Sequence, residues 1–315
     1  MRRTYLDFEE GLRALDRARD AARAQGDAET EAELLRDTEE RSRRICAHLT
    51  PWQRVQMSRH IDRPFTLDYV SALCADFVEL HGDRTFGDDA AMIAGLGLRG
   101  ERGLVVVGHQ RGRGTAEKVR RNFGMPRPEG YRKARRMFRL AAQAGLDVLT
   151  FIDTQGAFPG TESEERGIAE AIAGCIAELA GLPVPIVAVV IGEGGSGGAL
   201  ALAVSDTLLM LEHSCLAVIS PEGCASILER QRSPELIARA ADSLALTAPR
   251  LHELGIADEL VPEPVGGAHR DPAAAVHAAG EAIDRAFARL DALDPPALRA
   301  RRDARLRAIG SAAVG

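Results

Sequence analysis

The sequence predicts an α/β fold in which helices cover a largely buried sheet. From about residue 91 onward, short apolar runs alternate with longer segments rich in Ala and Leu, the pattern of strands joined by helices. The run Val184–Ile191 is apolar throughout, as expected of a strand buried on both faces. Five closely spaced glycines come directly after this run, and a helix-forming segment follows them. The glycines are Gly192, Gly194, Gly195, Gly197 and Gly198.

Residues 1–50 are predicted to be an N-terminal helical extension. Residues 7 to about 49 are rich in Ala, Leu, Glu and Arg, with a break at Gly26-Asp27. This pattern indicates two charged helices, packed as a hairpin or laid against a partner. Prolines at 51 and 64 mark residues 50–64 as a linker, in which Trp52 is the expected anchor.

Residues 51–293 are predicted to form the main α/β domain. In chain order we expect a helix at 67–80, a β-hairpin with strands at 91–98 and 104–109, a helix at 131–144, a strand at 148–153, a helix at 163–180, the central strand at 184–191, and short strands at 207–211 and 216–219. Helices are expected to dominate beyond Pro221. Residues 294–315 carry several arginines after Pro295-Pro296 and predict a poorly packed basic C-terminal tail.

The order strand, glycine stretch, helix directs free backbone N–H groups at a bound anion, because the first turn of a helix has unpaired donors. A tight strand-to-helix turn would need only one or two glycines, since each loses much entropy on ordering. A flexible linker is disfavoured by the apolar runs on both sides. No Lys-Ser/Thr pair follows the glycines, so the stretch is not a Walker loop, and it lacks the context of a dinucleotide fingerprint. We therefore predict an oxyanion- or phosphate-binding stretch.

A second glycine turn follows the strand at 148–153, in Thr154-Gln155-Gly156-Ala157-Phe158-Pro159-Gly160. Its strand ends roughly one βαβ unit before the central strand, so both glycine turns should emerge at the same edge of the sheet. Such edges are where α/β proteins bind ligands. The alternative is that Pro159-Gly160 forms a turn with no ligand.

Composition is ordinary for a soluble globular protein, with 45% hydrophobic and 27% charged residues. No apolar run is long enough to span a bilayer, and the N-terminus lacks a secretory apolar region, so a cytoplasmic protein is expected. The five cysteines form no Cys-x-x-Cys pair and have no histidine at metal-ligand spacing. We expect reduced thiols and no metal site in this chain.

Positive charge is concentrated in one window of a chain whose net charge is −6. The window His109–Arg139 contains eleven Lys and Arg but only Glu117 and Glu129 as acids, a net charge of +9. This suits a phosphate-bearing ligand or an acidic partner, and the alternative is a solvated helix face over Arg132–Arg139. Nucleic-acid binding is not expected, because the window matches no nucleic-acid motif.

No side-chain nucleophile can be assigned from the sequence. Ser196 lies between glycines without a nameable base, and the histidines His109, His213 and His269 are isolated. A site made of backbone N–H groups fits chemistry in which the substrate or cofactor supplies its own base, such as the stabilisation of an enolate.

A set of short motifs follows in a fixed order along the chain. The motifs are Tyr5–Glu9, Phe86–Asp89, Gly108–Arg113, Arg120–Pro126, Pro128–Ala134, the Asp153 turn, Gly192–Leu200, Ile219–Leu228 and Pro262–Arg270. Each motif alone is weak, but the ordered set is specific and spans nearly the whole chain. It resembles the α subunit of the bacterial acetyl-CoA carboxylase carboxyltransferase.

The resemblance implies a crotonase-like (ClpP/crotonase) α/β spiral over residues 51–293, with the N-terminal helices as an extension. It implies an α2β2 assembly with a β subunit, and a biotin carboxyl carrier protein and a biotin carboxylase as further partners. The implied reaction moves a carboxyl group from carboxybiotin, held by the carrier, to acetyl-CoA and gives malonyl-CoA for fatty acid synthesis. In this family the zinc ribbon belongs to the β subunit.

The resemblance also implies roles for particular residues. Gly197 and Gly198 are the expected oxyanion-type donors to the biotin ureido group. Gly194 and Gly195 are expected to shape the glycine stretch, and Gly156-Ala157 to wall the carboxybiotin pocket.

One departure from the family stands at Gln155, where the family turn usually has proline. Proline stiffens a turn by fixing φ, whereas Gln155 restores an N–H group and adds an amide. This leaves open a paralogue that acts on another acyl-CoA. Further alternatives are a crotonase-type hydratase, for which Glu164-Glu165 is a poor glutamate pair, a carboxyltransferase linked to a malonate or glutaconyl decarboxylase, and a non-catalytic scaffold subunit.

Overall fold

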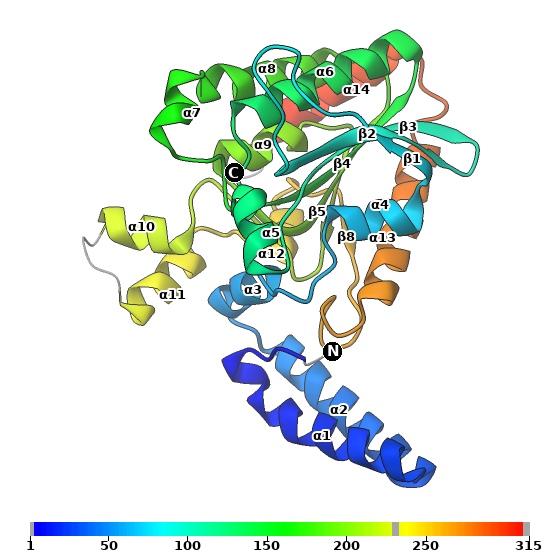
Figure 1. The fold of residues 1–315 in the computed structure, drawn as a ribbon, viewed down its shortest axis with the longest axis vertical. Helices are drawn as coiled ribbons and strands as arrows, with labels where there is room; N and C mark the ends of the chain where they lie inside the picture. Colours follow the sequence, from blue (N-terminus) through cyan, green and yellow to red (C-terminus); the bar gives the residue numbers. More distant parts are fainter. Residues whose placement is uncertain (1–2, 229–232, 311–315) are drawn as a thin grey trace.

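The computed structural model describes residues 3–228 and 233–310, and it confirms the predicted α/β class (Figure 1). One eight-stranded sheet has the strand order β1-β2-β3-β4-β5-β6-β8, and β7 pairs with the end of β5. The pairs β1–β2 and β2–β3 are antiparallel, and the other pairs are parallel. The strands are β1 (Ala75–Glu79), β2 (Met92–Arg99), β3 (Arg102–His109), β4 (Asp147–Thr154), β5 (Ile186–Gly195), β6 (Thr207–Leu211), β7 (Cys215–Ala217) and β8 (Glu259–Val261).

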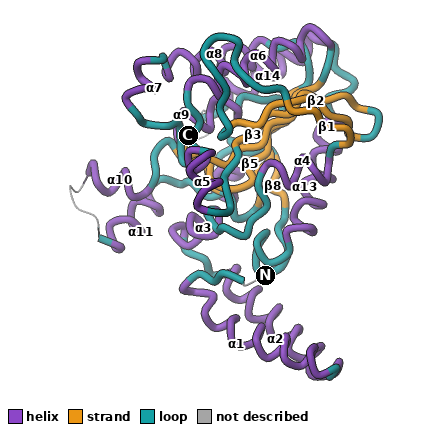
Figure 2. Tube along the Cα trace, in the orientation of Figure 1, coloured by secondary structure: helices purple, strands orange, loops and turns teal. Residues whose placement is uncertain are grey.

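Helices cover both faces of the sheet (Figure 2). On one face α6, α8 and α9 bury the larger apolar cluster, and on the other face α4 and α13 bury the second one. The parallel strands β4, β5 and β6 are buried almost throughout, because helices lie above and below them. The helices of the domain are α4 (Thr66–Leu73), α5 (Thr115–Arg120), α6 (Pro128–Ala144), α7 (Thr161–Glu165), α8 (Ile168–Gly181), α9 (Ser196–Ala203), α10 (Pro221–Leu228), α11 (Pro234–Ser243), α12 (Ala248–Glu253) and α13 (Pro272–Ala288), with a 3₁₀ turn η2 (Asn122–Gly124).

The N-terminal helical pair is confirmed. After a 3₁₀ turn η1 (Asp7–Glu9), α1 (Glu10–Gln25) and α2 (Ala28–Ala47) form a hairpin that extends away from the sheet (Figure 1). The connection turns at Gly26, whose φ of 73° is left-handed, and the Asp27 side chain accepts a hydrogen bond from the N–H of Thr30. Glycine and an Asp cap are the residues expected at such a break.

The predicted linker 50–64 and the helix 67–80 were both wrong in part. Residues Pro51–Ser58 form the helix α3, which begins at a capping box between Thr50 and Gln53. The helix α4 ends at Leu73, and the chain continues as the edge strand β1. The apolar residues of 67–80 fit a helical spacing, but their second half pairs with β2, a contact that local periodicity does not report.

The structure also differs from the sequence prediction in three further elements. The helix expected at 163–180 is two helices, α7 and α8, separated at Gly167 with a φ of 74°. The strand expected at 216–219 is β7, which ends at Ala217. The short strand β8 lies beyond Pro221, where helices were expected to dominate, and it pairs with β6.

The prediction of a poorly packed C-terminal tail was wrong for residues 295–308. They form helix α14 (Pro295–Ala308), which packs against the domain. Arg302 of this helix is fully buried and forms an ion pair with Asp206, with an Nη2–Oδ2 distance of 2.7 Å. The oxygen atoms that accept hydrogen bonds from Arg302 belong to residues about 100 positions earlier in the chain. The arginine-rich sequence gives no sign of these partners, and it therefore predicted a solvated terminus.

Candidate functional site

The two glycine turns lie side by side, as predicted. Strands β4 and β5 are parallel neighbours, and the pairing Thr154↔Gly194 joins them where both strands end. The Thr154 hydroxyl accepts from the Gly156 N–H at 3.0 Å and donates to the Gly156 carbonyl at 2.7 Å. These bonds fix the turn that carries Gly156 and Ala157 directly beside the end of β5.

The glycine stretch is not the loop that the sequence suggested. Residues up to Gly195 continue strand β5 and pair with both β4 and β7. A Cβ atom on Gly194 would lie 2.7 Å from Leu216 Cδ1, and one on Gly195 would lie 2.1 Å from the Gln155 carbonyl oxygen. Glycine is therefore needed here for the close approach of neighbouring backbones.

Gly197 and Gly198 lie in the first turn of α9. The N-cap is Gly195, which has no side chain to cap the helix, and N–H groups of a first turn have no carbonyl partner inside the helix. A Cβ on Gly198 would lie 2.6 Å from the Ala157 nitrogen and 2.8 Å from the Gly156 carbonyl carbon. A Cβ on Gly197 would meet only Ile172 methyl groups at 3.6 and 3.9 Å. The backbones of the two turns thus touch at Gly198.

Exposure differs along this turn. Gly198 is buried against the Gly156-Ala157 turn, Gly197 is partly exposed, and Ser196 and Gln155 are exposed. Beside the end of β5 lies a hollow of about 10 Å³, whose lining includes Gln155, Glu193, Gly194, Gly195 and residues of the segment 215–221. This volume holds one water molecule at most.

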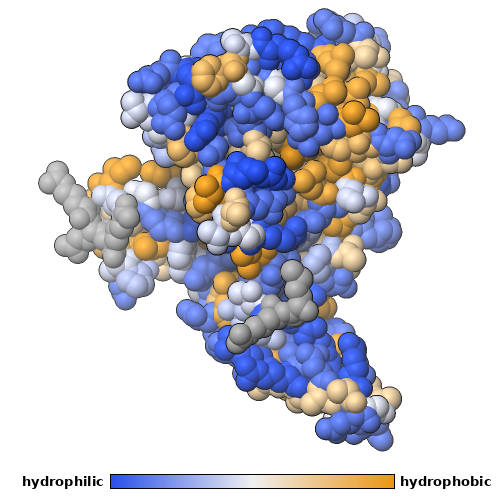
Figure 3. All heavy atoms as spheres, in the orientation of Figure 1, coloured by the Kyte–Doolittle hydropathy of each residue, from blue (hydrophilic) through white to orange (hydrophobic). Residues whose placement is uncertain are grey.

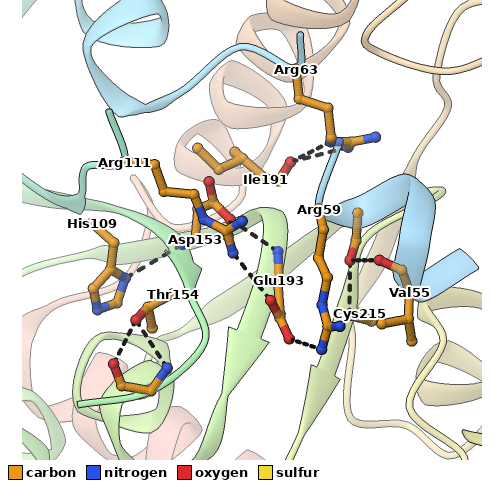
Figure 4. A network of polar contacts seen from close by, with 12 residues as sticks. Val55, Arg59, Arg63, His109, Arg111, Asp153, Thr154, Ile191, Glu193 and Cys215 are labelled. Carbon is orange, nitrogen blue, oxygen red and sulfur yellow. Dashed lines mark hydrogen bonds and ion pairs between the residues drawn. The ribbon is translucent and has the colours of Figure 1, made fainter. Parts of the chain in front are cut away.

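A chain of charged groups supports this edge of the sheet (Figure 4). The Glu193 carboxylate receives Arg59 at 2.7 Å on one oxygen and Arg111 at 3.2 Å on the other. Arg111 also contacts Asp153 Oδ1 at 3.1 Å, and the same oxygen accepts from the Glu193 N–H. Arg59 also forms an ion pair with Glu222 of α10, with an Nη1–Oε1 distance of 2.5 Å. The sequence analysis did not identify this network, because its members lie up to 163 positions apart.

A third arginine, Arg63, binds the strand just before the glycines. Arg63 donates to the Ile191 carbonyl from Nε and Nη2, at 3.2 and 3.0 Å, as Figure 4 shows. It also makes a two-point contact with the buried Glu263. Burial opposes ionisation of Glu263, but Arg63 outweighs it and lowers the pKa of that carboxyl to about 2. These contacts anchor the end of β5.

The titratable side chains at this edge are buried or held in ion pairs. Burial lowers the pKa of His109 to about 3, and its Nδ1 accepts a 3.4 Å hydrogen bond from the Asp153 N–H. Burial also raises the pKa of Asp153, although Arg111 opposes the shift. Glu193 has both carboxylate oxygens in ion pairs. The exposed residues named at this edge, Gln155 and Ser196, are uncharged.

The basic window His109–Arg139 is largely neutralised within the chain. Arg132 pairs with Asp83 at 2.7 Å, and the fully buried Lys133 pairs with Asp88 at 2.6 Å. Arg135 and Arg139 both contact Glu178. For Arg132–Arg139 the window is thus a structural set of ion pairs, with Arg136 donating to backbone carbonyls, rather than an open anion site.

A buried cluster joins the N-terminal extension to the domain. Glu9, His60 and His269 each have an atom that could ligate a metal ion, and these three atoms lie within 4.8 Å of one another. His269 Nε2 lies 2.9 Å from Glu9 Oε1. The Nδ1 atom of His60 accepts from the Asp62 N–H at 3.1 Å, so in the neutral ring Nε2 carries the proton. Because this N–H offers no lone pair to a metal ion, we interpret the cluster as a structural latch.

This latch predicts a pH-dependent stability. Burial, followed by the charge of His269, lowers the pKa of His60 to about 4. A lowered histidine pKa means that the unfolded chain takes up the proton first, so stability is complete above pH 6.5 and decreases as the pH falls toward 4. Between pH 7.5 and pH 5 we expect His60 to account for a loss of about 2 kcal/mol. Urea unfolding of the wild type and of His60→Gln at both pH values measures this, and an equal loss in both proteins would contradict it.

Among the described residues no helix combines the length and the apolar character needed to cross a membrane. The family described as acetyl co-enzyme A carboxylase carboxyltransferase-like matches residues 5–310. The chain is 49% identical to the acetyl-coenzyme A carboxylase carboxyl transferase subunit alpha of Halorhodospira halophila, over 98% of this chain and 99% of that one. It is 48% identical to subunit alpha 1 of Burkholderia thailandensis, over 98% and 97% of the two chains.

Solved structures of lower identity share the fold. A Pseudomonas malonate decarboxylase hetero-tetramer in complex with coenzyme A superposes with a TM-score of 0.58 at 17% identity, over 73% of this chain and 90% of that chain. A transcarboxylase 12S structure superposes with a TM-score of 0.55 at 18% identity, over 68% and 41%. These likenesses confirm the predicted crotonase-like fold.

Proposed function

Because the chain belongs to the family of acetyl-CoA carboxylase carboxyltransferase α subunits, we propose that its paired glycine turns bind carboxybiotin. In this proposal the N–H groups of Gly197 and Gly198 donate to the ureido oxygen of biotin. Gly156 and Ala157 form an adjacent wall of the pocket, and Gly194 and Gly195 hold the two turns together. The proposal rests on one observation, the contact between the backbone of the first turn of α9 and the backbone of the Gly156-Ala157 turn.

The chemistry of the family makes such donors useful. Carboxybiotin, carried by a partner protein, supplies CO2 and a ureido base for the α-proton of acetyl-CoA. The enolate of acetyl-CoA then attacks CO2 and gives malonyl-CoA. Negative charge appears on the ureido oxygen as CO2 leaves, and preorganised N–H groups stabilise such charge strongly in a site without water. The role of this chain is therefore to hold the ring and its charge.

The relatives' designation as subunit alpha implies a multi-subunit complex. We propose an α2β2 assembly with a β subunit, served by a biotin carboxyl carrier protein and a biotin carboxylase. Apolar side chains are exposed on and beside α10, at Val218, Ile227 and Leu228, and they support a partner at this surface. In Figure 3 hydrophobic spheres gather where α10 and α11 lie in Figure 1. All five cysteines are free, which supports the proposed cytoplasmic location.

A second candidate is a paralogue for another acyl-CoA. It is favoured by Gln155, which replaces the family proline and is exposed at the edge of the hollow. Its side chain and its N–H group both lie beside the Gly156-Ala157 turn, where they can alter the fit of a substrate.

Reconstitution with a β-type subunit tests both candidates. We expect the complex to carboxylate acetyl-CoA from carboxybiotin, and the isolated chain to be inactive in this assay. Preference for propionyl-CoA over acetyl-CoA would favour the paralogue, and hydratase activity of the isolated chain would overturn the proposal. A fully assembled but inert complex would instead indicate a scaffold subunit.

A further inference from the structure

Three consecutive residues in front of α6 adopt left-handed backbone. Asn122, Phe123 and Gly124 have φ values of 44°, 56° and 81°. Glycine adopts this conformation freely and asparagine tolerates it, but a bulky aromatic residue does so at a cost in free energy. The left-handed conformation of Phe123 is therefore the one in this turn that the intrinsic preference of the residue does not explain.

The side chain of Phe123 does not recover this cost by packing inside the domain. It is 52% exposed and belongs to none of the three apolar clusters of the described residues. Strained residues that the core does not require are concentrated at binding sites. The exposure and the strained backbone of Phe123 therefore indicate a role in ligand binding rather than in stabilising the fold.

The strained turn lies against the candidate site. A Cβ on Gly124 would lie 2.7 Å from Arg111 Cγ and 3.6 Å from the Asp153 carbonyl oxygen. Two residues later, the Pro126 carbonyl accepts from the Phe158 N–H at 2.9 Å. The segment that carries Phe123 is therefore fastened to the same turn that carries Gly156 and Ala157. In Figure 3 hydrophobic spheres border strongly hydrophilic ones where α5, which leads into this turn, lies in Figure 1.

We propose that Phe123 is a substrate-contacting residue that forms the apolar side of the biotin site, and this inference rests on the proposed function. Biotin has two unlike ends. Its ureido group is polar and suits the N–H groups of Gly197 and Gly198, whereas its sulfur-containing ring and valeryl arm are apolar. The exposed ring of Phe123, on a segment that is hydrogen-bonded to the Gly156-Ala157 turn, contacts the second end and orients the first.

The test is the variant Phe123→Gly in the reconstituted complex. Glycine accepts the left-handed φ, so the thermal midpoint of the variant is expected to be no lower than that of the wild type. In the reverse reaction, malonyl-CoA and free biotin give acetyl-CoA and carboxybiotin. There we expect the KM for biotin to rise about 10-fold from the lost apolar contact, while the KM for malonyl-CoA stays unchanged.

Val119→Ala is the matched control, because Val119 is 60% exposed on the neighbouring α5 and should alter neither constant. A lower thermal midpoint of Phe123→Gly would show that the ring serves the fold and would overturn the inference. So would an unchanged KM for biotin, or an increase confined to malonyl-CoA. If the wild-type complex itself fails to use biotin, the proposed function fails together with this inference, which separates the two cases.

Discussion

Gly198→Ala is expected to reduce kcat of the reconstituted complex about 10²-fold or more, although it adds one methyl group and keeps the N–H. The added Cβ would lie 2.6 Å from the Ala157 nitrogen and 2.7 Å from the Tyr131 hydroxyl. Both of its neighbours are buried backbone or a buried side chain, so α9 and the Gly156-Ala157 turn must separate. A displacement of reacting groups by about 1 Å costs about 10²-fold in rate.

Gly197→Ala is the matched control for this variant. Its Cβ meets only the methyl groups of Ile172 at ordinary contact distances, and it keeps the N–H as well. We expect a kcat within about threefold of the wild type. Steady-state kinetics of both complexes, after gel filtration has shown equal assembly, provide the comparison. Equal activity of the two variants would show that contact between the turns is irrelevant to the reaction.

Arg302→Met is expected to produce the largest loss of stability, about 3–5 kcal/mol, because it leaves Asp206 charged and buried without its partner. Arg302 donates to Asp206 at 3.0 and 2.7 Å, and to the carbonyls of Leu179, Leu182 and Val184 at 2.8, 2.8 and 2.9 Å. These bonds fasten α14 to the end of α8 and the start of β5. Urea unfolding followed by circular dichroism measures the effect.

Two further proteins make this result specific. Asp206→Asn combined with Arg302→Met removes the uncompensated charge and should be less destabilised than Arg302→Met alone. Arg307→Met removes an exposed guanidinium of the same helix, which pairs with Asp303, and should resemble the wild type. A similar loss for Arg307→Met and Arg302→Met would mean that helix α14 as a whole, rather than its buried arginine, is sensitive.

The sequence predicted the features that local pattern determines. The apolar run Val184–Ile191 was expected to be a buried strand and lies mostly within β5, and the break at Gly26-Asp27 separated two helices at the right place. The neighbourhood of the two glycine turns followed from the rule that parallel strands end at one edge. These are statements about one segment, or about two segments related by a simple connection.

The features that were missed depend on distant partners. Strand β1 exists because Val78 faces Leu96 across the sheet, and the same apolar residues also suit a helix. The glycines up to Gly195 read as a loop, yet the Gln155 backbone fills the space that a side chain would need. Glu193 stood among these glycines without an assigned role, because Arg59 and Arg111 reach it from other elements.

A crystal structure of the reconstituted complex with biotin bound is the most direct test of the proposed site. The account predicts the ureido oxygen about 3 Å from the amide nitrogens of Gly197 and Gly198, with the ring on the open side of the Gly156-Ala157 turn. Biotin bound at another surface, with these two amides facing solvent or protein, would contradict the assignment of both glycines.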